Sequence, residues 1–155
     1  MRLVLLCVLF ACVRASGQIE LRVNDAPPVK IAAADVAKLP RHTAALNNHG
    51  KQVQYEGVLM HDVLVLGGID FGNGLRGKQL SSYVAAIASD GYEVIYALAE
   101  FDPTVMDSGI VVADRREGRP LAADEGPLRI VVPQDKRSTR SLKLLREIDV
   151  VQLRK

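Results

Sequence analysis

Apolar and polar residues alternate over short distances along most of the chain, which is typical of a β-rich domain. Residues 19–23 alternate strictly and predict a half-buried strand. Two β-prone runs, 82–88 and 92–98, flank Asp90-Gly91 and predict a hairpin, because glycine accepts the positive φ of a tight turn. The apolar runs that predict further extended segments are 53–55, 110–113, 128–132 and 148–150.

Helical patterns in the chain are few and short. Residues 32–39 carry apolar side chains on one helical face before Pro40 and predict a short helix. A second helical segment is predicted from Leu59 to Leu66, closed by Gly67-Gly68. Residues 99–106 predict a turn or short helix, and the charged residues 114–120 predict a turn. No regular βαβ alternation is present, so we expect an α+β fold, a single mixed domain with a β-core and short helices.

The N-terminus has the pattern of a signal peptide, which divides the chain into 1–17 and a domain over 18–155. Arg2 precedes an almost purely apolar run, and Ala15 and Gly17 offer small residues for cleavage. The run is shorter than the roughly 20 residues of a spanning helix. We therefore expect an exported, periplasmic protein; the alternatives are an uncleaved anchor, a buried helix, or a lipoprotein modified at Cys12.

Removal of residues 1–17 changes both the charge and the thiol chemistry. The chain has 20 basic and 18 acidic residues, and this segment contains Arg2 and Arg14 but no acid, so 18 of each remain. A net charge of zero gives no argument for nucleic-acid binding. Both cysteines, Cys7 and Cys12, lie in the same segment. A mature chain therefore has no disulfide, cysteine-zinc site, iron–sulfur cluster or cysteine nucleophile.

Four stretches of the remaining chain resemble a known family. They are the aromatic-x-Gly segment that begins at Tyr55-Glu56-Gly57, then Ser89-Asp90-Gly91-Tyr92, then residues 126–133 with the sequence GPLRIVVP, and a basic loop over 136–146. In this order they are similar to the molybdopterin-binding domain of sulfite-oxidase-type oxidoreductases, and the resemblance covers about 19–152.

The resemblance implies a set of ligand-binding residues. Arg129 matches the arginine of the family's Gly-Pro-x-Arg, and Ser138, Thr139 and Arg140 match the loop that contacts the phosphate and pterin of the cofactor. The family's molybdenum ligand is a cysteine ahead of the aromatic-x-Gly segment. Residues 43–50 of this chain occupy that neighbourhood and contain none; His49 stands there as a candidate pterin contact. We therefore expect a pterin or molybdopterin-type ligand, no molybdenum and no catalytic residue.

Some side chains keep two interpretations at this point. An arginine that opens an apolar strand must be paired, and the partner of Arg129 is either a ligand phosphate or an internal carboxylate such as Glu125. Tyr92 and Tyr96 have strand spacing and are predicted to face one side, either against a flat pterin or within the core. The three histidines, His42, His49 and His61, fall on different predicted segments, so we expect no metal site.

Three functions fit this sequence. The first is an exported binding protein that holds a pterin-like ligand and presents it to a membrane receptor or enzyme partner. The second is a molybdenum-cofactor-dependent oxidoreductase, or its subunit, with an atypical metal ligand. The third is a fold used only for protein contacts. The absence of a cysteine favours the binding protein over the oxidoreductase, because in this family the cysteine thiolate is bonded directly to the metal.

Overall fold

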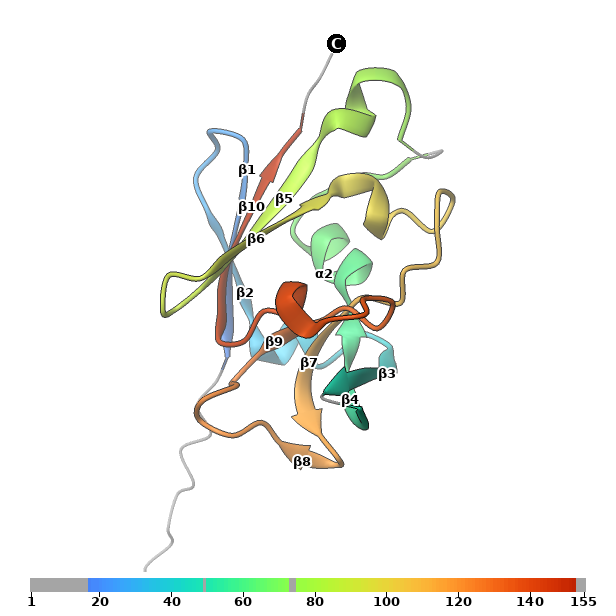
Figure 1. The fold of residues 1–155 in the computed structure, drawn as a ribbon. Coiled ribbons are helices and arrows are strands. Elements are labelled where there is room, and N and C mark those ends of the chain that lie inside the picture. The colour runs from blue at the N-terminus through green and yellow to red at the C-terminus, as the bar shows by residue number, and fades with distance from the viewer. Residues whose placement is uncertain (1–16, 49, 73–74, 153–155) are drawn as a thin grey trace, which may run out of the picture.

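The computed structural model describes residues 17–48, 50–72 and 75–152. This part of the chain forms two β-sheets with short helices and 3-10 turns (Figure 1). This arrangement confirms the predicted α+β class. The elements are β1 (Gln18–Val23), β2 (Val29–Ala32), α1 (Ala33–Val36), β3 (Arg41–Asn48), β4 (Lys51–Leu59), α2 (Met60–Leu66), the 3-10 turn η1 (Gly77–Ser81), β5 (Tyr83–Ala88), β6 (Glu93–Ala97), the 3-10 turn η2 (Leu98–Phe101), β7 (Val111–Arg116), β8 (Arg119–Pro120), β9 (Arg129–Val131), the 3-10 turn η3 (Ser138–Arg140) and β10 (Leu145–Val151).

The first sheet has the strand order β2-β1-β10-β5-β6. The first and last strands lie side by side in parallel, with Leu21 opposite Ile148, while the other pairs are antiparallel. Strand β10 therefore ties the C-terminal part of the domain to its beginning. The loop that precedes β10 carries η3 and enters the sheet next to the β5–β6 hairpin.

The second sheet has the order β3-β4-β7-β8, and β9 pairs with the other end of β7. Its register shifts between Glu56 and Gly57 on β4. At Gly57 an added Cβ would lie 2.1 Å from the carbonyl oxygen of Val112 and 2.6 Å from Cα of Ala113. The aromatic-x-Gly motif therefore has a physical reason, because only glycine allows β7 to approach this closely.

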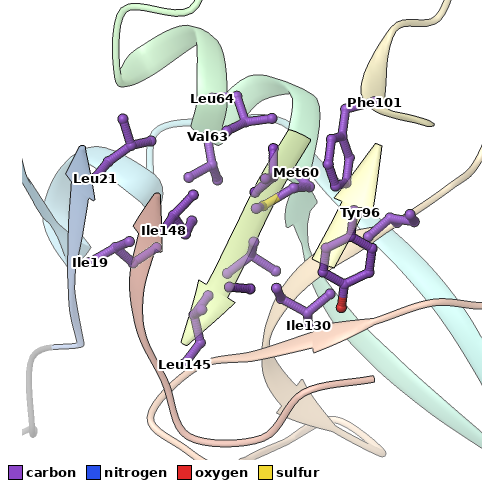
Figure 2. Close-up of a cluster of buried hydrophobic side chains, with 14 of the residues drawn as sticks. Ile19, Leu21, Met60, Val63, Leu64, Tyr96, Phe101, Ile130, Leu145 and Ile148 are labelled. Carbon is purple, nitrogen blue, oxygen red and sulfur yellow. The ribbon is translucent and has the colours of Figure 1, made fainter. Parts of the chain in front are cut away.

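The main core lies between the two sheets and α2 (Figure 2). Met60, Val63 and Leu64 of α2 point toward Ile148 of the first sheet and Ile130 of the second. All five side chains are fully buried, which anchors β9 and β10 on both sides of the η3 loop.

Most of the predicted elements are present, two of them are shorter than predicted, and one strand was not predicted. The hairpin around Asp90-Gly91 is confirmed as β5 and β6. The predicted helix over 32–39 shortens to α1, because Ala32 pairs with Gln18 in the sheet. The predicted charged turn over 114–120 is present but narrower: the chain turns at Glu117 and Gly118, with φ of 50° and 74°, and the residues on either side pair as β7 and β8. Strand β3 has no counterpart among the predicted elements.

The predicted signal peptide covers residues that lie almost entirely outside the described part of the chain, since the structure describes the chain from residue 17 onward. Within the described residues, no helix has the length and apolar character that a membrane crossing requires.

Candidate functional site

The loop between β9 and β10 contains the residues that the sequence singled out, and it is held in place by its own backbone and by both sheets. Ser138 to Arg140 form η3, closed by the Ser141 N–H donating to the Ser138 carbonyl at 3.0 Å. The hydroxyl of Ser141 accepts the Val132 N–H at 3.0 Å, and the Leu142 carbonyl accepts the Ile130 N–H at 2.7 Å. Ser141 and Leu142 therefore lie beside β9 and the residue that follows it.

Two tyrosines of the β5–β6 hairpin fasten the other side of the loop. Tyr92 donates its hydroxyl to the Thr139 carbonyl at 2.9 Å, and Tyr96 donates to the carbonyl of Arg140. Tyr92 is half exposed, whereas Tyr96 is buried against Phe101. The two tyrosines contact consecutive residues of η3, which confirms the prediction that they face one side.

Arg140 is neutralised by acidic partners within the fold. Its guanidinium donates to Asp135 through two nitrogens, at 2.9 and 2.8 Å, and to Glu100 at 3.0 Å. These contacts raise the pKa of Arg140, so it stays charged. It also lies 5.5 Å from the ring centre of Tyr96. Arg140 therefore joins the loop to η2, and little of its charge is left for a ligand.

Arg129 lies beneath the same loop and is only 2% exposed. Its Nη1 donates to Glu125 at 3.1 Å and to the Tyr55 hydroxyl at 3.0 Å, and its Nη2 donates to the Ser141 carbonyl at 3.3 Å. The guanidinium also stacks 4.6 Å from the centre of the Tyr55 ring. Of the two interpretations of Arg129, the internal pair with Glu125 is the one that the structure contains.

The single negative charge of Glu125 lies close to three positively charged side chains. The same oxygen, Oε1, lies 3.1 Å from Arg129, 3.1 Å from Arg116 and 3.7 Å from Lys143. Arg116 and Lys143 are partly exposed, with side-chain exposures of 40% and 48%. One carboxylate facing three cations leaves a local excess of positive charge at the edge of the loop, which favours an anionic ligand.

An open pocket of about 240 Å³ lies where the loop meets the Asp90–Tyr92 turn. It is lined by Asp90, Tyr92, Ser138, Thr139, Ser141, Leu142 and Lys143. Ser138 and Thr139, which the sequence predicts as ligand contacts, both line this pocket. Arg129 and Arg140 do not line the pocket. Arg129 bonds to the backbone of the loop, and Arg140 joins the loop to acidic side chains. Lys143, a residue of the basic loop over 136–146, lines the pocket as well.

A smaller cavity of about 70 Å³ lies beside His61, between α2 and the segment after η2. The His61 ring stacks on Phe71 with centres 4.9 Å apart, and its Nδ1 lies 2.8 Å from Asp62. None of the residues matched to the family's ligand loop lines this cavity, so the larger pocket is the better candidate.

The neighbourhood of the family's cysteine is the β3–β4 hairpin. Residues 43–48 belong to β3, a regular antiparallel strand that runs close to η3. His49 lies outside the described residues, so its predicted pterin contact stays a prediction. Across residues 17–48, 50–72 and 75–152, no three His, Cys, Asp or Glu side chains form a group that could hold a metal ion.

The structure is therefore a small α+β domain with an open pocket beside its β9–β10 loop. The chain belongs to the oxidoreductase molybdopterin-binding domain family, whose model matches residues 18–155. Among solved structures it is similar to the sulfane dehydrogenase SoxCD from Paracoccus pantotrophus, with a TM-score of 0.63 and 16% identity. The match covers 87% of this chain and 38% of that chain, so this chain corresponds to well under half of that protein. No curated protein matches the chain.

Proposed function

We propose that this protein is a binding module that holds a pterin-type ligand in the pocket of the β9–β10 loop and does not carry out molybdenum redox chemistry. The observation that carries the proposal is the lining of the pocket. Ser138 and Thr139, the residues that match the family's ligand loop, lie there beside Tyr92 and Lys143. Family membership over residues 18–155 supports the same class of ligand.

The groups that line the pocket suit a flat heterocycle with a negative substituent. Tyr92 is 51% exposed and offers an aromatic face for stacking. The hydroxyls of Ser138 and Thr139 donate and accept hydrogen bonds, and the carboxylate of Asp90 accepts them. Lys143, with the excess charge around Glu125, attracts an anion. The volume lies below the roughly 300 Å³ at which enclosed ligand pockets begin, so the ligand would remain partly exposed.

The residues present do not fit molybdenum held in the family's manner. Residues 18–155 contain no cysteine, and the resemblance puts the family's thiolate within residues 43–50, which lie mostly in β3. A neutral or oxygen ligand in that place would alter the affinity and redox potential of the metal. We therefore derive no redox step for this chain.

Family membership keeps one alternative in view, a molybdenum-cofactor-dependent oxidoreductase, or its subunit, with an atypical metal ligand. The two functions differ in one measurable property, the molybdenum bound per chain. Export to the periplasm and presentation of the ligand to a membrane receptor or enzyme partner belong to the proposal as well. The signal-peptide pattern of residues 1–17 supports the export.

The proposal is tested by titrating the protein into a fluorescent pterin carboxylate and following the quenching of pterin emission. The chain has no tryptophan, so the pterin signal is read without interference. Lys143→Ala should weaken binding about fivefold, while Lys136→Ala, an exposed lysine of the same loop that does not line the pocket, should leave it unchanged. Thr139→Val, which removes one hydroxyl, should weaken binding by a similar factor. No quenching with the unmodified protein would overturn the proposal.

A further inference from the structure

The three-residue turn η3 is too short to hold its own position, so its place beside the pocket depends on what the rest of the fold attaches to it. A single 3-10 turn contributes one hydrogen bond of its own, from Ser141 to Ser138. The hydroxyl of Tyr96 binds the carbonyl of Arg140 at the end of the turn. Tyr96 itself is 1% exposed, and its ring packs in the main core. A rigid side chain of β6 therefore reaches the backbone of the ligand loop.

Glu100 makes the second connection. Its Oε1 accepts the N–H of Ala97 at 3.0 Å, where β6 ends and η2 begins, and its Oε2 accepts Nη1 of Arg140 at 3.0 Å. The same carboxylate thus closes η2 and holds the arginine of η3. The Arg140 guanidinium also lies over the Tyr96 ring, so the two connections are adjacent.

We propose that Tyr96 and Glu100 are positioning residues for the ligand-binding loop. Tyr96 holds the backbone carbonyl of Arg140 and Glu100 holds its guanidinium. Together these contacts set where Ser138 and Thr139 lie in the pocket. Neither residue lines the pocket, so any effect they have on a ligand passes through the loop. This inference rests on the proposed function, since it assigns to these residues a share of the ligand affinity.

The state of the Tyr96 hydroxyl suits this role. Burial raises the pKa of Tyr96 well above its ordinary value, and the charge of Arg140 only partly offsets the effect. The hydroxyl therefore keeps its proton and donates to the Arg140 carbonyl throughout the physiological pH range.

The test compares Tyr96→Phe and Glu100→Gln with Tyr83→Phe, which makes the same chemical change at an exposed tyrosine of the neighbouring strand β5. Tyr96→Phe keeps the buried ring and removes only the hydroxyl. Amide hydrogen exchange of residues 138–142 is measured in the ligand-free protein, and affinity is measured with the fluorescent pterin carboxylate. Tyr96→Phe should speed exchange and weaken binding, each about fivefold to tenfold. Glu100→Gln keeps an acceptor for Ala97 and should show a smaller change in the same direction.

Three results would overturn the inference. One is unchanged exchange over 138–142 in Tyr96→Phe, because the loop would then be held by other contacts. Another is faster exchange with unchanged pterin affinity, because a merely structural bond would behave in that way. A third is equal effects in Tyr83→Phe. If the unmodified protein bound no pterin, the proposed function would fail, and with it the ligand part of this inference. Hydrogen exchange is measured without ligand, so it tests the contacts to the loop separately from the proposed function.

Discussion

Arg129 and Glu125 form a buried ion pair beside the β9–β10 loop, with 3.1 Å between Nη1 and Oε1. Both side chains are less than a tenth exposed. Arg129, which matches the arginine of the family's Gly-Pro-x-Arg motif, therefore has a structural role: it donates to the carbonyl of Ser141, a residue that lines the pocket. A buried charge of this kind is tolerated only while it is paired.

Arg129→Met is expected to destabilise the protein by about 2–4 kcal/mol, because Glu125 loses one of its three cations and the buried Tyr55 hydroxyl and Ser141 carbonyl lose their hydrogen bonds. Urea unfolding followed by circular dichroism measures the change. Arg115→Met, at an exposed position of β7, is the matched control and should change stability by less than about 0.5 kcal/mol. A stable Arg129→Met protein that has lost only its ligand would show instead that Arg129 is a direct ligand contact.

Gly57→Ala is expected to destabilise the domain by about 3 kcal/mol or more. The new methyl group would lie 2.1 Å from the Val112 carbonyl oxygen, and backbone on both strands would have to separate. Gly50→Ala is a useful comparison, because Gly50 has a φ of 82° but no atom within 4 Å of the added carbon, so only its backbone conformation is penalised. Its cost should be about 1–2 kcal/mol. Equal melting temperatures for the two variants would contradict the close approach at Gly57.

Asp102 is expected to make stability depend on pH in the acid range. Its carboxylate is fully buried and accepts hydrogen bonds from the Leu75 N–H and from the N–H and hydroxyl of Thr104. Burial alone would raise the pKa of Asp102, but these hydrogen bonds outweigh it and lower the pKa from its ordinary 3.8. The stability that results is present above pH 3.8 and is lost as the pH falls through the lowered value.

Asp102→Asn should therefore be less stable than the unmodified protein at neutral pH, by about 1–3 kcal/mol, and the difference should shrink in acid. Urea unfolding at a series of pH values gives both quantities. A difference that stays constant down to and below pH 3.8 would show that the charge of Asp102 is not what the hydrogen bonds stabilise.

Salt should weaken the binding of an anionic pterin more than that of a neutral one. The positive excess around Glu125 comes from Arg116 and Lys143, which are both exposed enough for solvent ions to screen. Titrations of a pterin carboxylate and of its neutral methyl analogue, each at low and high salt, measure the effect. Equal salt dependence for the two ligands would indicate that the negative group does not contact this edge of the pocket.

Elements marked by strong local signals could be predicted from the sequence. The β5–β6 hairpin could be predicted from Asp90-Gly91, because a tight turn between two strands requires residues that accept its backbone conformation. Strand β3 was missed because its residues, RHTAALNN, carry few strong strand formers; it exists through pairing with β4 along its whole length. The turn of the β7–β8 hairpin was predicted too wide for a similar reason, since charged residues occupy both of its strands.

The site was only partly within reach of the sequence. Ser138 and Thr139 were found through the family motif, and Glu125 was named as a partner of Arg129. The contacts that shape the pocket join residues that are far apart along the chain, such as Tyr92 with Thr139 and Glu100 with Arg140. No local pattern records such pairs, because they depend on where the two sheets place the β5–β6 hairpin beside the last loop.

The most direct test of the account is the composition of the protein purified from a host that makes molybdenum cofactor. Native mass spectrometry reports any bound pterin, and elemental analysis reports molybdenum per chain. The account predicts a chain that retains or takes up a pterin with no stoichiometric molybdenum. A chain that carries one molybdenum per molecule would contradict it and would identify this domain as an oxidoreductase with an unusual metal ligand.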